Sequence, residues 1–131
     1  MIGKTVPVID LAPYTTPNSD TTETAKAIRE ACKHIGFFYV KNHGVPEQLI
    51  KSIFANSAKF FSLPREEKRE IRMENAGRAW RGYYEVGEEK TNGKIDYHEA
   101  IYLGKEQYPN DPRVIAETPL HGENLYPVQV P

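Results

Sequence analysis

The fold is decided by residues 36–45, which read Gly36-Phe37-Phe38-Tyr39-Val40-Lys41-Asn42-His43-Gly44-Val45. The aromatic and β-branched run 37–40 predicts a strand that is too apolar to be exposed on both faces. Gly36 ends the preceding element, and Asn42-His43-Gly44 is typical of a turn. We expect His43 to fix this turn by hydrogen bonding to backbone rather than to act in catalysis.

A helix is predicted on the N-terminal side of this strand. Ser19 and Asp20 are candidate N-caps, and Glu23 follows Asp20 in the register of a capping box. Apolar residues recur with helical spacing at Ile28, Ala31, Cys32 and Ile35. Because Cys32 lies on this apolar stripe, we interpret it as a core thiol rather than as a nucleophile.

Two further helices are predicted on the C-terminal side. Pro46 suits a first helical turn, and an inward-facing apolar stripe follows at Leu49, Ile50, Ile53, Phe54, Phe60 and Phe61. Pro64 opens the next helix, whose charges alternate in sign through residues 65–70. Glu66 and Arg69 are spaced i, i+3, so this segment indicates a solvated helix face.

Extended segments occupy both ends of the chain. Residues 6–11 predict an edge strand, because Pro7 lacks a backbone donor. Residues 80–84 and 96–103 are also extended, and the second predicts a strand with Tyr97, Glu99, Ile101 and Leu103 on one face and His98 on the other. The proline-rich residues 108–131 indicate a covering loop or linker. The fold class is therefore α/β (α+β), with helices packed on a small sheet in one domain, 1–131.

Composition excludes several function classes. The 131 residues carry 17 basic and 18 acidic side chains, for a formal net charge of −1. This balance argues against a nucleic-acid or membrane-surface binder, and no long apolar run predicts a membrane span. One cysteine cannot form an internal disulfide, so a reducing, cytoplasmic location is expected.

Trp80, Arg81, Tyr83 and Tyr84 are the group that most suggests a ligand site. Aromatic rings interleaved with arginine can line a pocket for an anionic or planar ligand. The alternative is a strand with aromatic packing and one solvated arginine. His121-Gly122-Glu123 has the spacing of a metal-binding pair, but it lies between prolines in a loop, and no metal site is predicted.

The order of these segments resembles the opening of the isopenicillin N synthase-like non-haem iron oxygenases. Residues 36–45 are the most specific part of the resemblance. It extends through Val6–Leu11, Phe60–Lys68, Arg81-Gly82-Tyr83, Asp96–Glu99 and His121–Pro127, and covers nearly the whole chain. The resemblance implies an N-terminal region that packs on a double-stranded β-helix, or jelly-roll, core.

It also implies Fe(II), O₂ and 2-oxoglutarate as reactants with a small organic substrate. In the family, an H-x-D motif and a distant histidine hold the iron, and an R-x-S motif binds 2-oxoglutarate. Neither motif occurs in these 131 residues. The resemblance therefore implies a dioxygenase N-terminal domain whose catalytic core is absent, and the chain alone is expected to be inactive and to bind neither Fe(II) nor 2-oxoglutarate.

Two functions are weighed at this stage. The first is an enzyme fragment in which Tyr84, Trp80 and Arg81 contact the substrate, as this stretch does in some family members. The second is a non-catalytic, stand-alone binding module that pairs with a separate jelly-roll chain. Either way, strands that lack a partner sheet predict marginal stability.

Overall fold

The computed structural model describes residues 5–130. Short helices and strands alternate along the chain, which divides after Ser52 into two compact units. The first unit holds one sheet and the second holds two, and each unit has its own buried residues. The mixture of helices and strands agrees with the predicted fold class, but the strands form three two-stranded sheets instead of one small sheet.

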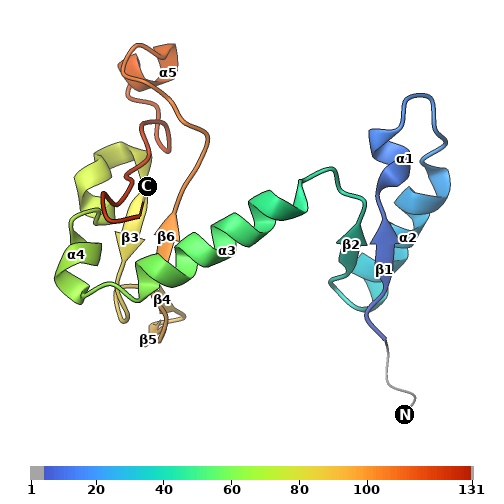
Figure 1. Ribbon diagram of the computed structural model, residues 1–131, viewed down its shortest axis with the longest axis horizontal. Coiled ribbons are helices and arrows are strands. Elements are labelled where there is room, and N and C mark those ends of the chain that lie inside the picture. Colours follow the sequence, from blue (N-terminus) through green and yellow to red (C-terminus); the bar gives the residue numbers. More distant parts are fainter. Residues whose placement is uncertain (1–4, 131) are drawn as a thin grey trace. The chain divides into compact units, whose positions relative to one another are not determined.

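The first unit is a βαβ arrangement. Strand β1 (Val8–Asp10) pairs in parallel with β2 (Tyr39–Lys41), in the register Val8↔Tyr39. Helix α2 (Thr22–His34) makes the crossover that a parallel pair requires, and the short α1 (Ala12–Thr15) follows β1. Figure 1 shows β1 and β2 side by side with α2 near them.

Asp10 and the 42–44 turn close this unit. The Asp10 carboxylate accepts hydrogen bonds from the Ala12 backbone and from Asn42 Nδ2, both at 2.9 Å. These bonds lower the pKa of Asp10, the one from Ala12 most strongly. The backbone of Val45 donates to His43 Nδ1 at 3.1 Å, which confirms the predicted turn role of His43.

Three predictions for the first unit are wrong. The N-cap of α2 is Thr21, and Asp20 instead accepts from the Thr22 backbone at 2.8 Å. Cys32 is exposed rather than in a core. The apolar run at 37–40, of which only Tyr39 and Val40 belong to β2, is also largely exposed, since Phe37 and Tyr39 keep more than 60% of their surface. A two-stranded sheet is too small to cover these apolar side chains: within the described part of this unit, Ile9 and Ala31 alone are buried.

Two helices begin where prolines predicted them. Helix α3 (Glu47–Phe61) follows Pro46, and α4 (Arg65–Arg69) follows Pro64. Glu66 and Arg69, which are spaced i, i+3, form an ion pair at 3.2 Å. The expectation that α4 is a solvated face fails at Lys68, which is buried because its ammonium group is bonded to Glu99 at 2.8 Å.

The second unit has its core at the pairing of β3 (Gly82–Tyr84) with β6 (Ala100–Tyr102). The pair is antiparallel, with Tyr83 opposite Ile101. Phe60, Ile71 and Tyr83 form the buried cluster, and the Phe60 and Tyr83 rings meet edge to face at 5.7 Å. Strands β4 (Lys90–Thr91) and β5 (Lys94–Ile95) form a hairpin around Asn92-Gly93.

The C-terminal segments differ from the sequence-based expectation in detail. The strand predicted over 96–103 is confined to β6, and Tyr97 is 86% exposed because the chain before Ala100 lies outside the ladder. Residues 108–130 are mostly loop, as predicted, with one short helix, α5 (Pro112–Ile115); residue 131 lies outside the described residues. No helix within residues 5–130 is long and apolar enough to cross a membrane.

Candidate functional site

The second unit contains a hollow of about 620 Å³ beside β3 and β6. The 3₁₀ segment η1 (Met73–Ala79), the loop after β3 and the end of β6 supply the rest of its wall. The hollow is lined by Met73, Glu74, Gly77, Trp80, Tyr84, Glu88, Glu89 and Tyr102. Two of the three predicted substrate-binding residues, Trp80 and Tyr84, therefore lie at one site.

Tyr84 is the most buried aromatic side chain that lines the hollow. It is 7% exposed, and its ring stacks on that of Tyr102 with centroids 5.5 Å apart. Its hydroxyl donates to Glu89 Oε2 at 2.8 Å and lies 2.6 Å from His98 Nε2. Burial, together with the bond to the Glu89 carboxylate, raises the pKa of Tyr84 well above its usual range, so the hydroxyl stays protonated.

Trp80 and Arg81 adjoin the hollow in different ways. Trp80 is 64% exposed at the rim, and its backbone is left-handed, with φ of 54°. The Arg81 guanidinium donates to the carbonyl oxygens of Ala79 at 2.9 Å and Leu120 at 3.1 Å. Arg81 therefore ties the Trp80 loop to the C-terminal segment, and it is not among the residues that line the hollow.

One wall of the hollow is acidic. Glu74, Glu88 and Glu89 line it, and Arg72 beside them bonds Glu74 at 3.1 Å and also pairs with Glu88. A hydrogen bond from its own backbone, followed by the bond to Arg72, lowers the pKa of Glu74. The sequence did not predict this wall, because its members come from separate segments with no common spacing.

Ion pairs and hydrogen bonds next to β3 fix the strand that carries Tyr84. Glu85 is buried and accepts from Arg65 Nε at 2.6 Å and from Arg69 on helix α4. The bond to Arg69, with further contributions from Arg65, lowers the pKa of Glu85 to about 2. The Tyr83 hydroxyl donates to Glu99 at 2.5 Å, and Glu99 also holds the buried Lys68.

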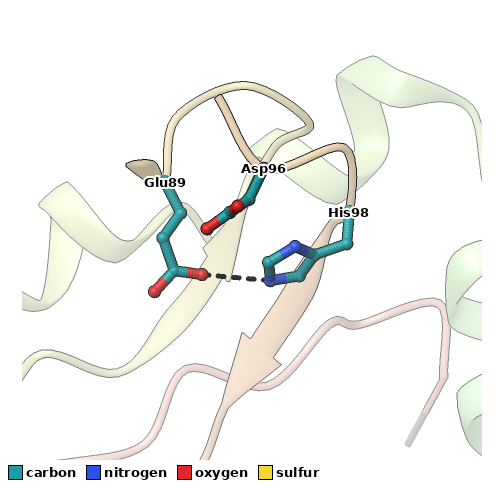
Figure 2. A group of neighbouring side chains, drawn as sticks. All are labelled: Glu89, Asp96 and His98. Atoms are coloured by element: carbon teal, nitrogen blue, oxygen red, sulfur yellow. Dashed lines mark ion pairs between the residues drawn. The ribbon is translucent and has the colours of Figure 1, made fainter. Parts of the chain in front are cut away.

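Glu89, Asp96 and His98 form a small cluster at the edge of the hollow. Figure 2 shows these three side chains converging: Glu89 and Asp96 stand at the two ends of the β4–β5 hairpin, and His98 stands in the segment before β6. Their potential ligand atoms all lie within 4.8 Å of one another, and Glu89 pairs with His98 at 3.0 Å. Asp96 already accepts a hydrogen bond from Thr91 Oγ1 at 2.6 Å.

His121, the histidine of the His121-Gly122-Glu123 segment, stabilises its own loop. The His121 Nδ1–H donates to the carbonyl oxygen of Pro119 at 2.8 Å. The ring therefore fixes its own loop, in agreement with the interpretation of His121-Gly122-Glu123 as a loop.

Comparison with known proteins assigns the family. Residues 6–129 match the family described as the N-terminal region of non-haem dioxygenase in morphine synthesis. The chain belongs to this family. The resemblance that residues 36–45 carried is thereby confirmed, and the family is one of non-haem, 2-oxoglutarate-dependent dioxygenases.

Two of the named relatives are an oxidoreductase and a hydroxylase. The chain is 46% identical to a Dictyostelium discoideum protein named as a probable iron/ascorbate oxidoreductase, with 93% of this chain and 34% of that protein covered. It is 37% identical to a homoarginine-6-hydroxylase of Oryza sativa subsp. japonica, with 95% of this chain and 40% of that protein covered. The chain thus spans between about a third and two-fifths of the length of these relatives.

A solved relative shows the same N-terminal fold. This full-length Neurospora crassa protein, whose crystal structure was determined in complex with alpha-KG (2-oxoglutarate), superposes with a TM-score of 0.65 at 31% identity. The match covers 95% of this chain and 37% of that chain.

The cluster that residues 5–130 bring together does not fit the family's iron. A facial triad needs two imidazoles and one carboxylate with open positions. The Glu89–Asp96–His98 cluster offers one imidazole and two carboxylates, and the sequence holds no H-x-D motif. This cluster therefore lacks the second imidazole that the family's iron site requires.

Proposed function

We propose that this chain is the N-terminal part of a 2-oxoglutarate- and Fe(II)-dependent oxidoreductase that acts on a small organic substrate. The observation that carries the proposal is the family match over residues 6–129, together with relatives of which this chain covers about a third. The iron-binding H-x-D and histidine and the R-x-S motif would belong to a jelly-roll core outside these 131 residues. The chain alone is then inactive.

We further propose that the hollow at Tyr84 forms one wall of the substrate pocket. Tyr84 and Trp80 would contact the substrate, since both line the hollow, while Arg81 would position Trp80 through the carbonyls of Ala79 and Leu120. A largely apolar hollow with a few polar groups is the usual form of a small-molecule site. The cytoplasmic location stays a prediction from the single cysteine.

The test uses the complete polypeptide with Fe(II), ascorbate and 2-oxoglutarate. Compounds named for the relatives form the first panel: homoarginine, 1-aminocyclopropane-1-carboxylate and thymine. With the compound that is turned over, Tyr84→Ala should raise KM at least tenfold. Consumption of 2-oxoglutarate without the organic substrate should stay within twofold, because the iron site lies in the core.

Tyr108→Ala is the matched control, since Tyr108 is exposed and does not line the hollow. It should leave both rates unchanged. If Tyr84→Ala also leaves KM unchanged, the hollow is not part of the substrate pocket. A complete polypeptide that consumes no 2-oxoglutarate under any condition would overturn the enzyme assignment itself.

A further inference from the structure

We infer that the hollow binds the positively charged end of an organic cation, a guanidinium or an alkylammonium group. Only one part of this inference rests on the proposed function, namely that the bound cation is the substrate of the enzyme. The binding itself follows from the charge and the aromatic surface of the hollow.

The charge of the hollow is negative. Its lining contains three carboxylates, from Glu74, Glu88 and Glu89, and among residues 5–130 no lysine or arginine lines it. Arg72 is shared between Glu74 and Glu88 and also lies 3.8 Å from Glu85, so one cation serves three carboxylates. The buried Glu85 has its own partners in Arg65 and Arg69.

Of the three carboxylates that line the hollow, Glu89 is the one that Arg72 does not pair with. Its oxygen Oε2 accepts from the Tyr84 hydroxyl at 2.8 Å and lies 3.0 Å from His98 Nε2. In the described part of the chain its ion pairs include no lysine or arginine. Its side chain is 43% exposed, so a cation can reach it from the hollow.

Aromatic rings line the same hollow. Tyr84 and Tyr102 stack with an interplanar angle of 24°, and Trp80 stands at the rim with most of its surface exposed. A guanidinium or ammonium group is attracted to the faces of such rings, and the planar guanidinium also stacks on them. Carboxylates beside aromatic faces are thus a combination that selects an organic cation.

Ligands of other charge are disfavoured by the same groups. A carboxylate or phosphate ligand would be repelled by the three glutamates. A neutral ligand of the same shape would displace water from these carboxylates and supply no compensating charge. We therefore expect discrimination by charge among ligands of equal size.

The fluorescence of Trp80 tests the inference directly, because it is the one tryptophan in the sequence and it lines the hollow. The 131-residue chain, at a concentration at which light scattering shows it to be monomeric, is titrated at constant ionic strength with butylguanidinium, butylammonium, N-butylurea and butyrate. Butylguanidinium and butylammonium should each give a saturable change. N-butylurea, the neutral analogue of butylguanidinium, should bind at least fivefold more weakly, and butyrate should give no saturable change.

Two glutamate variants locate the site. Glu89→Gln should weaken butylguanidinium binding at least threefold, because the amide still accepts from Tyr84 but carries no charge. Glu123→Gln, at an exposed glutamate outside the hollow, is the control and should bind as the parent chain does. Circular dichroism checks folding; if Glu89→Gln is unfolded, Glu74→Gln is used and the same weakening is expected.

Equal binding of N-butylurea and butylguanidinium, or an unchanged affinity in the folded glutamate variant, would overturn the inference. This assay needs no iron, 2-oxoglutarate or core. Its failure would leave the proposed oxygenase with a substrate that is not cationic. Conversely, a failed turnover test with Tyr84→Ala would not alter the binding result.

Discussion

Gly82 occupies a backbone position that no other residue fits. Its φ is +110°, and a Cβ atom there would lie 2.4 Å from the carbonyl oxygen of Ile71. That carbonyl accepts the backbone N–H of Tyr83 at 2.8 Å, so it cannot move away without breaking the bond. The close approach sets the direction of β3 and hence the position of the Tyr84 ring.

We predict that Gly82→Ala destabilises the chain by at least about 2 kcal/mol, since strain at positive φ adds to a backbone clash. Gly93→Ala is the matched control: its φ is +77°, but nothing lies within 4 Å of the added Cβ. Urea unfolding measures both variants. Equal losses for Gly82→Ala and Gly93→Ala would show that the contact with Ile71 does not matter.

At single positions, the sequence indicated which aromatic residues lie at the hollow, but it did not indicate which groups the charged residues contact. Trp80 and Tyr84 were singled out because aromatic residues cluster there, and both line the hollow. Arg81 belongs to the same run of sequence, but its guanidinium bonds backbone 39 residues away at Leu120. Sequence spacing carries no information on such a long-range partner. The acidic wall was not predicted for the same reason.

At the scale of elements, the helix starts that follow prolines were predicted, and the burial of side chains was not. Pro46 and Pro64 mark the starts of α3 and α4, because proline disfavours a helix interior and suits a first turn. Alternating charge on α4 indicated a solvated face, yet Lys68 is buried against Glu99 and Arg69 reaches Glu85. These partners are far from α4 in the sequence: Glu85 follows β3, and Glu99 precedes β6.

The contact between α4 and the end of β3 should make stability depend on acid pH. The arginines lower the Glu85 pKa from 4.5 to about 2, so between these values the unfolded chain binds more protons than the native chain. The stabilisation is therefore present above pH 4.5 and is lost as the pH falls toward 2. The loss is of the order of 3 kcal/mol, because each pKa unit corresponds to about 1.4 kcal/mol.

Urea unfolding between pH 2 and 6 measures this dependence. Glu85→Gln, which cannot titrate, should show a flatter decline than the parent chain, although it is less stable at pH 6. The control Glu123→Gln changes an exposed carboxylate and should follow the parent curve. Parallel curves for Glu85→Gln and the parent chain would contradict the role given to this carboxylate.

At the scale of the molecule, the first unit leaves much apolar surface uncovered. Its large exposed side chains include Val8, Phe37, Tyr39, Val40 and Leu49. The apolar pattern at 37–40 predicted burial, and the relatives extend well beyond the length that this chain matches. We propose that a jelly-roll core covers this surface.

The 131-residue chain alone is therefore predicted to be marginally stable and to self-associate, because its apolar faces and strand edges lack partners. Light scattering and thermal unfolding of the purified chain check this prediction. The complete polypeptide, handled in the same buffer, should stay monodisperse. A chain that is monomeric alone and unfolds in one cooperative step above about 65 °C would contradict it.

The most direct test of the central claim is to sequence the transcript beyond the codon for Pro131. We predict an open reading frame that encodes an H-x-D motif, a later histidine and an R-x-S motif, in a protein whose length matches that of the relatives. A stop codon at this point, with an intact mass near 14.9 kDa in cells, would contradict the claim that this chain is the front part of an oxygenase polypeptide.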